Sequence, residues 1–383
     1  MSDSPDRPGH VAIAHDYLTQ RGGAEKVVLA LQRAFPSAPI YTTLYEQDTT
    51  YPEFSESRII TSPLNAVSFF RRSHRLALPF LAWASGRIKV DADHTIVSSS
   101  GWAHGFRTRG SKIVYCYSPA RWLYQPAAYL GAATRTPAAL MLRVLSPFLK
   151  RWDRRAAGTA TKYFAISTVV QQRIKDTYGL ESEVLPAPHT VDKSIAHEPV
   201  DLRQLSESEG FYLCISRLLP YKNVDVVINA FNELGLPLVV VGTGPEERRL
   251  AGLAGDSVVM VKNLTDGQIQ WLYAHCTAVV SSSYEDFGLT PIEGATHGKP
   301  SVVLRWGGFL DTIVEGRTGV YFDEPTPSAV AEAVQTSRAS EWDESAIRAH
   351  ADLFTEEHFA RRLRDEIARL DGASASSRVH PAS

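Results

Sequence analysis

The segment from residue 211 to residue 241 decides the fold, and it reads FYLCISRLLPYKNVDVVINAFNELGLPLVVV. Its two ends, 211–215 and 237–241, are short apolar runs that are typical of buried β-strands. Between them, residues 224–234 have the length and the apolar spacing of a helix. A strand, a helix and a second strand in this order predict two parallel strands joined by a crossover helix.

The same alternation continues through the second half of the chain. Further strands are expected at 257–261, 277–281, 301–304 and 320–322, with a helix at 328–336. Together these segments predict a doubly wound sheet of about six strands, which binds ligands beyond the carboxyl ends of its strands. The first half predicts a second α/β domain, with a helix at 24–34 and strands at 11–15, 95–98, 112–115 and 163–166.

The length of 383 residues favours two domains over one hydrophobic core. The segment 185–192, LPAPHTVD, is the expected boundary because its two prolines disfavour both a helix and a central strand. We therefore expect domains at 1–190 and 191–354, followed by a charged amphipathic helix at 355–371. The small residues of the tail, 372–383, predict disorder.

Composition indicates a globular cytosolic protein. Hydrophobic residues make up 44% of the chain and charged residues 21%, and no stretch has the ~20 apolar residues of a membrane span. The first ten residues are polar, without the apolar core of a signal peptide. The three cysteines are widely separated, which favours buried thiols over disulfides or a zinc site. Charge is unevenly distributed: residues 1–190 hold 23 Lys and Arg against 14 Asp and Glu.

Two candidate phosphate-binding elements follow the first strands of the second domain. Arg217 and Lys222 come after the strand 211–215, where their cationic groups could converge on a diphosphate; the alternative is a pair of solvated charges. Gly242 and Gly244 follow the next strand and allow a tight turn near ligand phosphates. Glu247 stands where the dinucleotide-binding fingerprint has its third glycine, so the turn is not that motif.

The most specific motif follows the strand 277–281. Glu285 and Glu293 stand eight residues apart, with Pro291 suited to the first position of a helix. Thr290 and Glu293 also have the spacing of a capping box, which gives Glu293 a structural alternative. A Gly307–Gly308 turn after the next strand would bring the backbone close to a ligand bound beyond the carboxyl ends of the strands.

In this order, the motifs resemble glycosyltransferase family 4, whose retaining enzymes have the two-domain GT-B fold. The resemblance covers essentially the whole chain and is strongest to the mannosyltransferase-like branch that builds surface polysaccharides. The first half adds HDYL at 15–18, GGAE at 22–25, SSS at 98–100 and YCYSPAR at 115–121. The resemblance implies two Rossmann-like domains facing across a deep cleft, with the C-terminal helix crossing back to the first domain.

The resemblance also implies roles for individual residues. Arg217 and Lys222 would neutralise the donor diphosphate, Glu293 would bind the ribose hydroxyls, and Glu285 would face the transferred sugar. Catalysis would then rest on positioning and on charge stabilisation at the leaving group, without an enzyme nucleophile. The remaining donor-binding positions would be Gly22, Gly23, Gly242, Gly244, Phe287, Gly288, Leu289, Gly307 and Gly308.

Two positions depart from the family pattern. Relatives often have histidines where this chain has Tyr117 and Gly101, and the nearest imidazole is that of His104. His104 is therefore a candidate catalytic residue, with a structural polar residue as the alternative. Asp91-x-Asp93 resembles a metal-binding pair of another glycosyltransferase architecture, but we interpret it as a solvated turn and expect no metal and no cofactor.

The expected donor is a nucleotide-diphosphate sugar, with GDP-mannose favoured over UDP-sugars, and the expected acceptor is a glycan or a lipid-linked glycan. Alternatives are a nucleotide-sugar epimerase or hydrolase on the same fold and a degenerate, non-catalytic subunit. The segments 69–81 and 142–155 mix apolar and basic residues. They suit either contact with anionic lipid at the inner face of the cell membrane or core-facing helices with a basic outer side. No nucleic-acid-binding module accompanies the charge.

Overall fold

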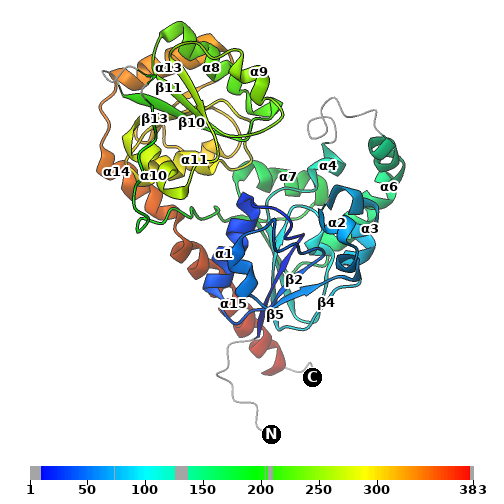
Figure 1. Cartoon of the computed structure of the whole chain (residues 1–383). Helices are drawn as coiled ribbons and strands as arrows, with labels where there is room; N and C mark the ends of the chain where they lie inside the picture. Colours follow the sequence, from blue (N-terminus) through cyan, green and yellow to red (C-terminus); the bar gives the residue numbers. More distant parts are fainter. Residues whose placement is uncertain (1–9, 73, 126–136, 203, 206–209, 380–383) are drawn as a thin grey trace. The chain divides into compact units, whose positions relative to one another are not determined.

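The computed structural model describes residues 10–72, 74–125, 137–202, 204–205 and 210–379 (Figure 1). The chain forms two compact units: an N-terminal unit, Met1–Pro188 with Glu356–Ser383, and a C-terminal unit, His189–Thr355. The chain passes from the N-terminal to the C-terminal unit inside the proline-containing segment 185–192, where a boundary is expected. The chain returns to the N-terminal unit after Thr355, one residue beyond the expected end of the second domain.

The C-terminal unit is built on a six-stranded sheet in which every pairing is parallel. The strand order is β12-β11-β10-β13-β14-β15, so the chain builds outward from β10 in one direction and then returns to its other side with β13. This is the Rossmann order, and its switch point lies between β10 and β13. The strands are β10 Phe211–Ile215, β11 Leu238–Val241, β12 Val258–Val261, β13 Cys276–Ser281, β14 Ser301–Leu304 and β15 Gly319–Phe322.

Helices cover both faces of this sheet, which explains why its strands are apolar on both sides. α8 and α13 pack on one face through residues such as Phe231 and Val330, and α10 packs on the other through Leu272 and Tyr273. The helices are α8 Val224–Leu234, α9 Glu247–Ala251, α10 Asp266–His275, α11 Leu289–Thr296, α12 Phe309–Thr312, α13 Pro327–Ala339 and α14 Glu344–Ala351.

The N-terminal unit has a seven-stranded parallel sheet in the order β3-β2-β1-β5-β7-β8-β9 and a separate pair, β4-β6. Its switch point lies between β1 and β5. The sequence pattern misses β2, β3 and β9 because each has only two or three residues. The strands are β1 Val11–His15, β2 Ile40–Thr42, β3 Ile59–Thr61, β4 Lys89–Val90, β5 His94–Ser99, β6 Arg107–Thr108, β7 Ser111–Cys116, β8 Lys162–Ala165 and β9 Glu183–Val184.

The last helix of the chain belongs to the N-terminal unit, in agreement with the expected return of the C-terminal helix. It packs against α1, and its Phe359 is buried with the ring centroid 5.1 Å from that of Tyr115. The helices of this unit are α1 Gly23–Ala34, α2 Ser68–Arg72, α3 His74–Ser85, α4 Arg121–Tyr124, α6 Pro137–Ala157, α7 Thr168–Tyr178 and α15 Glu356–Val379.

The expectation of disorder from residue 372 is corrected, because α15 continues to Val379. Helix-favouring Ala373, Ala375 and Arg378 lie in this stretch, and the first proline comes only at position 381. Residues 380–383 lie outside the described residues.

Cys116, Cys214 and Cys276 are buried and form no disulfides, as their apolar surroundings in the sequence indicate. Within the described residues, no helix is both long and apolar enough to cross a membrane.

Candidate active site

Lys222 and Glu285 meet at the switch point of the C-terminal sheet. Lys222 ends a single 3-10 turn, Pro220–Lys222, after β10, and Glu285 lies in the loop after the neighbouring strand β13. The Lys222 ammonium forms an ion pair with Glu285 Oε1, which also accepts a hydrogen bond from Ser283 Oγ at 3.1 Å. Because Lys222 is only 8% exposed, this pairing keeps a nearly buried cation directed at the carboxyl edge of the sheet.

Asn223 fastens the two loops to each other. Its Nδ2 donates to the carbonyl oxygen of Ser282 at 2.9 Å, and Ser282 Oγ donates to the Asn223 carbonyl at 2.6 Å. Asn223 has a φ of 49°, a left-handed conformation that asparagine tolerates better than most residues. The local chain direction after Lys222 is therefore fixed by a residue suited to this turn.

Arg217 precedes this pair on the loop that follows β10. Its side chain is exposed, and within the described residues its guanidinium has no hydrogen-bond or ion-pair partner. Arg217 and Lys222 therefore differ: one is free to meet a ligand, and the other is already held by a carboxylate.

Gly242 and Gly244 are required by packing between loops. A Cβ at Gly242 would lie 1.9 Å from the carbonyl oxygen of Ser216, and one at Gly244 would lie 2.3 Å from that of Leu218. The N–H of Leu218 donates to the Thr243 carbonyl at 2.9 Å. The two glycines thus let the turn after β11 support the loop that carries Arg217.

The Gly307–Gly308 turn supports the Glu285 loop in the same way. A Cβ at Gly308 would lie 2.2 Å from Phe287 Cα, and the Gly308 N–H donates to the Glu285 carbonyl at 3.0 Å. Gly288, with a φ of 83°, comes directly before α11 and packs against the ring of Phe309. Phe287 is buried, so only its backbone is suited to ligand contact.

The capping-box alternative for Glu293 is wrong. α11 begins at Leu289, with Gly288 at the N-cap and no side-chain cap, so Thr290 and Pro291 already lie inside the helix. Instead, Glu293 Oε2 accepts a hydrogen bond from Tyr273 Oη at 2.7 Å. Burial, with a further contribution from Glu293, raises the pKa of Tyr273, which keeps the phenol a donor.

In the N-terminal unit, Gly22 and Gly23 form the entry to α1. Gly22 is the N-cap, and a Cβ there would lie 2.6 Å from Glu25 Oε2. Glu25 is buried in the first turn, and burial raises the pKa of its carboxyl group. Glycine at position 22 therefore makes room for an acidic side chain directly beneath the turn.

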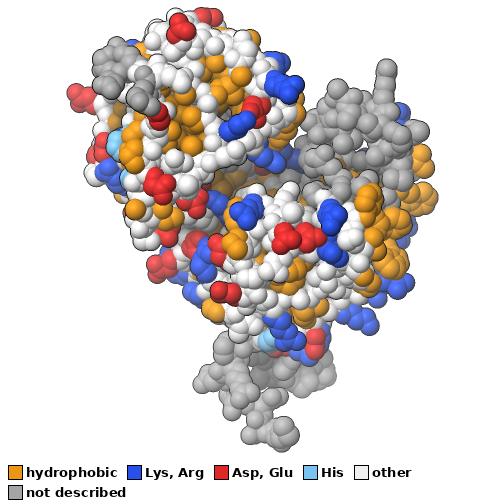
Figure 2. Space-filling view, viewed as in Figure 1, with side chains coloured by type: hydrophobic (Ala, Val, Ile, Leu, Met, Phe, Trp, Pro, Cys, Tyr) orange, Lys and Arg blue, Asp and Glu red, His pale blue; other side chains and the backbone are white. Residues whose placement is uncertain are grey.

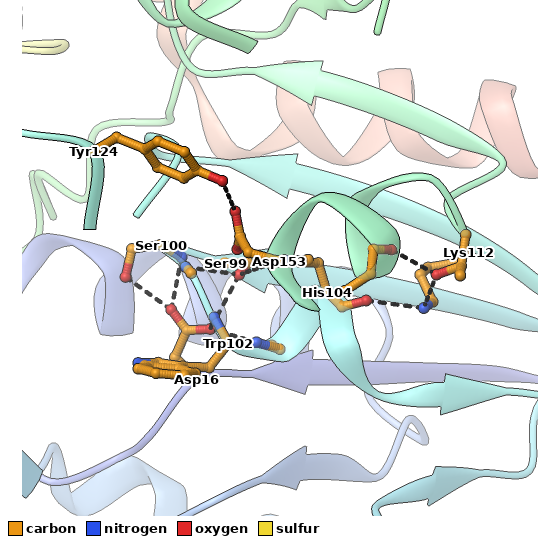
Figure 3. A network of polar contacts seen from close by, with 12 residues as sticks. Asp16, Ser99, Ser100, Trp102, His104, Lys112, Tyr124 and Asp153 are labelled. Carbon is orange, nitrogen blue, oxygen red and sulfur yellow. Dashed lines mark hydrogen bonds and ion pairs between the residues drawn. The ribbon is translucent and has the colours of Figure 1, made fainter. Parts of the chain in front are cut away.

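Asp16 organises the switch point of the N-terminal sheet, a role that the HDYL and SSS segments do not reveal in the sequence. Its buried carboxylate accepts five hydrogen bonds of 2.6–3.0 Å (Figure 3). The donors are the hydroxyls of Ser99 and Ser100 and the backbone N–H groups of Ser100, Trp102 and Ala103. One carboxylate after β1 thereby fixes the loop after β5.

His104 lies inside this unit, which favours its structural alternative over a catalytic role. It is 3% exposed; its Nδ1 is 3.3 Å from Ser99 Oγ, and its Nε2 is 3.0 Å from Asp153 Oδ1 (Figure 3). The second contact is an ion-pair approach that does not meet hydrogen-bond geometry. Tyr124 Oη donates to the other oxygen of Asp153 at 2.8 Å. No ring nitrogen is left exposed to a substrate, so we do not retain His104 as a catalytic candidate.

Asp91 and Asp93 lie at the surface, and Arg109 contacts both carboxylates, at 3.1 and 2.7 Å. Across the described part of the chain, no three His, Cys, Asp or Glu side chains cluster as metal ligands. The pair thus has the solvated, arginine-bound surroundings expected of a surface turn.

The known proteins to which this chain is similar include several glycosyltransferases. Residues 202–348 match the family described as glycosyl transferases group 1. The chain is 24% identical to the alpha-1,3/1,6-mannosyltransferase of Dictyostelium discoideum over 85% of this chain and 88% of that one. It is 26% identical to the GDP-mannose-dependent phosphatidylinositol monomannoside mannosyltransferase of Mycolicibacterium smegmatis, over 47% of this chain and 54% of that one. These matches support a place among the glycosyltransferases.

Several other curated relatives are matched over only about half of their length, between 44 and 58%. Among solved structures, the chain resembles HepE of Anabaena in complex with UDP-glucose, with a TM-score of 0.67 and 16% identity, over 94% of this chain and all of that one. At this identity the likeness shows the fold. The chain has the GT-B fold of two Rossmann-like domains.

Proposed function

We propose that this chain is a retaining glycosyltransferase that transfers a hexose, most favourably mannose, from a nucleotide-diphosphate sugar to a glycan or lipid-linked acceptor. The observation that carries the proposal is the convergence of Lys222 and Glu285 at the switch point of the C-terminal sheet. Ligands of doubly wound sheets bind at this point. The match to group 1 glycosyl transferases over the same unit supports it.

The cations would act on the leaving group. As the bond between the anomeric carbon and the diphosphate breaks, negative charge grows on the diphosphate oxygens. A nearly buried Lys222 stabilises that charge more strongly than a solvated lysine because less water screens it. Arg217, which is exposed, would add a bidentate contact to the phosphates. The ion pair with Glu285 holds Lys222 in place before the donor binds.

The carboxylates and helix α11 would position the donor. Glu293 has one oxygen fixed by Tyr273, and a carboxylate in this state can still accept hydrogen bonds from ribose hydroxyls. The first N–H groups of α11, from Leu289 onward, are donors without partners inside the helix and would bind the sugar. Glu285, which already contacts Lys222, would face the sugar itself. At the entry of α1, Gly22 and Gly23 would allow a phosphate to approach backbone N–H groups, as the family resemblance implies.

The donor preference rests on the relatives. One of them is named as GDP-mannose-dependent and another as a mannosyltransferase, and this supports GDP-mannose as the donor of this chain. We propose that no metal takes part, because Arg217 and Lys222 supply the positive charge that a bound cation would otherwise bring.

The first test is thermal stability with GDP, UDP, ADP or inorganic phosphate, without magnesium and with chelator. A nucleotide at a hundred times its Kd should add ~2.7 kcal/mol of stability. Lys222→Ala and Glu293→Ala should abolish the shift. Lys262→Ala is the matched control, because it also removes a Lys–Glu ion pair of this unit, the one with Glu247, away from the switch point.

Turnover then separates the enzyme classes. A transferase forms product only when an acceptor is added, whereas a hydrolase or an epimerase consumes the donor alone. No shift with any nucleotide would contradict the donor site and would favour a non-catalytic subunit. A shift without acceptor-dependent turnover would retain the site and reject the transferase.

A further inference from the structure

The outer surface of α2, α3 and α6 carries an unusual concentration of exposed apolar side chains. Phe148 and Val144 on α6 are 75% and 66% exposed, and Phe69 on α2 is 59% exposed. Phe80 and Trp83 on α3 are about half exposed. α3 packs against both α2 and α6, so these residues form one region, in which Figure 2 shows hydrophobic side chains among lysines and arginines. We call it the apolar–basic surface.

Helix α6 uses two different faces. Leu149 is buried and Leu145 and Trp152 are partly buried in the core with Trp102, and they form the inner face. Val144 and Phe148, one turn apart, point outward instead. A helix that only packs on the core should have a polar outer side. The exposed Val144 and Phe148 therefore argue against the interpretation of α6 as a core-facing helix with a merely basic exterior.

Helix α3 contributes an apolar groove. Phe80 and Trp83 line a shallow depression together with Leu64 and Phe70, and the rings of Phe70 and Phe80 lie 5.7 Å apart. The guanidinium of Arg87 lies 4.4 Å from the centre of the Trp83 ring. An indole beside a guanidinium is suited to a boundary between apolar and charged surroundings.

Positive charge predominates in the part of the sequence that carries these residues. Residues 57–152 contain 14 Lys and Arg but only two acids, Asp91 and Asp93, both of which contact Arg109. A second depression on α6 is lined by Pro147, Lys150, Arg151, Arg154 and Arg155. Asp153, the acid of this helix, is buried. Arg71 on α2 is paired with Glu46 at 3.0 Å, whereas the cations that line the depression on α6 belong to a helix whose one acid is buried.

We propose that the apolar–basic surface docks on a lipid bilayer with anionic headgroups. Phe69, Phe80, Trp83, Val144 and Phe148 would enter the interfacial region, while the arginines of α6 would meet the headgroup phosphates. Charge complementarity selects this occupant, because a neutral apolar partner would leave the row of cations unpaired. The docking requires no nucleotide sugar and is therefore independent of the proposed reaction.

The test uses the full chain and vesicles of phosphatidylcholine with or without about a third phosphatidylglycerol, in a flotation assay. We expect binding to the anionic vesicles, weakened by salt, and an intrinsic-fluorescence blue shift that is reduced in Trp83→Phe. Each basic residue near an anionic surface contributes about 1 kcal/mol, so Arg151→Ala/Arg155→Ala should lower the partition coefficient about 30-fold. Val144→Ser/Phe148→Ser should lower it by at least tenfold.

Matched controls lie on the C-terminal unit. Leu310→Ser/Leu353→Ser removes two apolar side chains that are also about half exposed, and Arg317→Ala/Arg338→Ala removes two arginines from the same unit. Both controls should bind vesicles like the wild type. Since the substituted side chains of the apolar–basic surface lie outside the core, melting temperatures should change little, which excludes unfolding as the cause.

Three results would overturn the proposal. Equal loss in the control variants would place the lipid contact elsewhere or make it unspecific. Unchanged binding of the Val144/Phe148 variant would exclude insertion. A concentration-dependent dimer that Phe148→Ser dissociates, without any vesicle binding, would assign the surface to a second copy of the chain.

Discussion

Replacing Gly308 by alanine tests whether the Gly307–Gly308 turn holds the Glu285 loop in place by contact. The added Cβ would lie 2.2 Å from Phe287 Cα and 2.5 and 2.6 Å from the carbonyl oxygens of Phe287 and Asp286. All three are backbone atoms, so no side chain can rotate away. Gly308 itself has φ −69° and ψ −14°, which alanine adopts readily. The cost is therefore purely steric.

To restore ordinary contact distances, the Glu285–Leu289 loop must move by about 1 Å. Overpacking of this kind costs about 1–3 kcal/mol. For a unit of this size, each kcal/mol lowers Tm by about 2–4 °C. We expect Gly308→Ala to lower Tm by a few degrees and, because Lys222 is held by Glu285, to weaken nucleotide binding at least tenfold as the loop moves.

Substitutions at two other glycines separate the effect of steric overlap from that of backbone strain. Gly316 has a φ of 73°, but no atom lies within 4 Å of the position that a Cβ would occupy, so Gly316→Ala should cost about 1–2 kcal/mol of stability through backbone strain alone. Its nucleotide affinity should match the wild type. Gly252 has φ −73°, and a Cβ there would meet the carbonyl oxygens of Arg249 and Arg248 at ordinary contact distances of 3.5 and 3.7 Å, so Gly252→Ala should not impair either property. Calorimetric Tm and titration with the nucleotide found in the screen provide the measurements. A Gly308→Ala protein with wild-type affinity and Tm would refute the account of the turn.

Lys222→Met should lower kcat/KM for the donor by about 100-fold or more, because in the proposed reaction it removes a preorganised charge at the leaving group; a loss below tenfold would contradict that role. Tyr273→Phe removes the 2.7 Å hydrogen bond to Glu293 and should raise the nucleotide Kd by about three- to tenfold, measured by titration; an unchanged Kd would show that Glu293 needs no support. Burial lowers the pKa of Lys112 to about 8, below the ~10.4 of an unfolded chain. Below pH 8, the buried ammonium lowers the free energy of unfolding by a constant amount. Between pH 8 and ~10.4 this loss shrinks by about 1.4 kcal/mol per pH unit, so the stability of the wild type rises with pH. Urea unfolding should show Lys112→Met losing stability relative to the wild type between pH 8 and 10; a pH-independent difference would contradict the shift.

The sequence pattern predicted the C-terminal unit closely because its strands are buried on both faces. Such strands are continuous apolar runs, and the predicted boundaries of β10 and β14 agree with the structure at every residue. The order of these strands then placed Arg217, Lys222 and Glu285 after neighbouring strands. The carboxyl edge of a parallel sheet collects such loops whatever their separation in the chain.

The sequence pattern did not predict the contacts between loops. The interpretation of Gly242 and Gly308 as sites of close ligand approach did not include their packing against Ser216 and Phe287, which depends on where two turns meet in space. His104 showed no sign of burial in its local sequence, because Asp153 lies 49 positions away on another helix. The capping-box pattern of Thr290 was overridden by Gly288, whose left-handed backbone starts the helix two residues earlier.

The return of α15 to the N-terminal unit has a consequence for how the chain is made. Phe359, Leu363 and Ile367 belong to the buried core of a unit whose other residues end at Pro188. During synthesis, the C-terminal unit can therefore complete its sheet before α15, the last helix of the N-terminal unit, has been made. A ribosome that stops before Glu356 would release one finished unit and one with an uncovered α1. The unit that is synthesised first can thus complete its fold only after α15 has been synthesised.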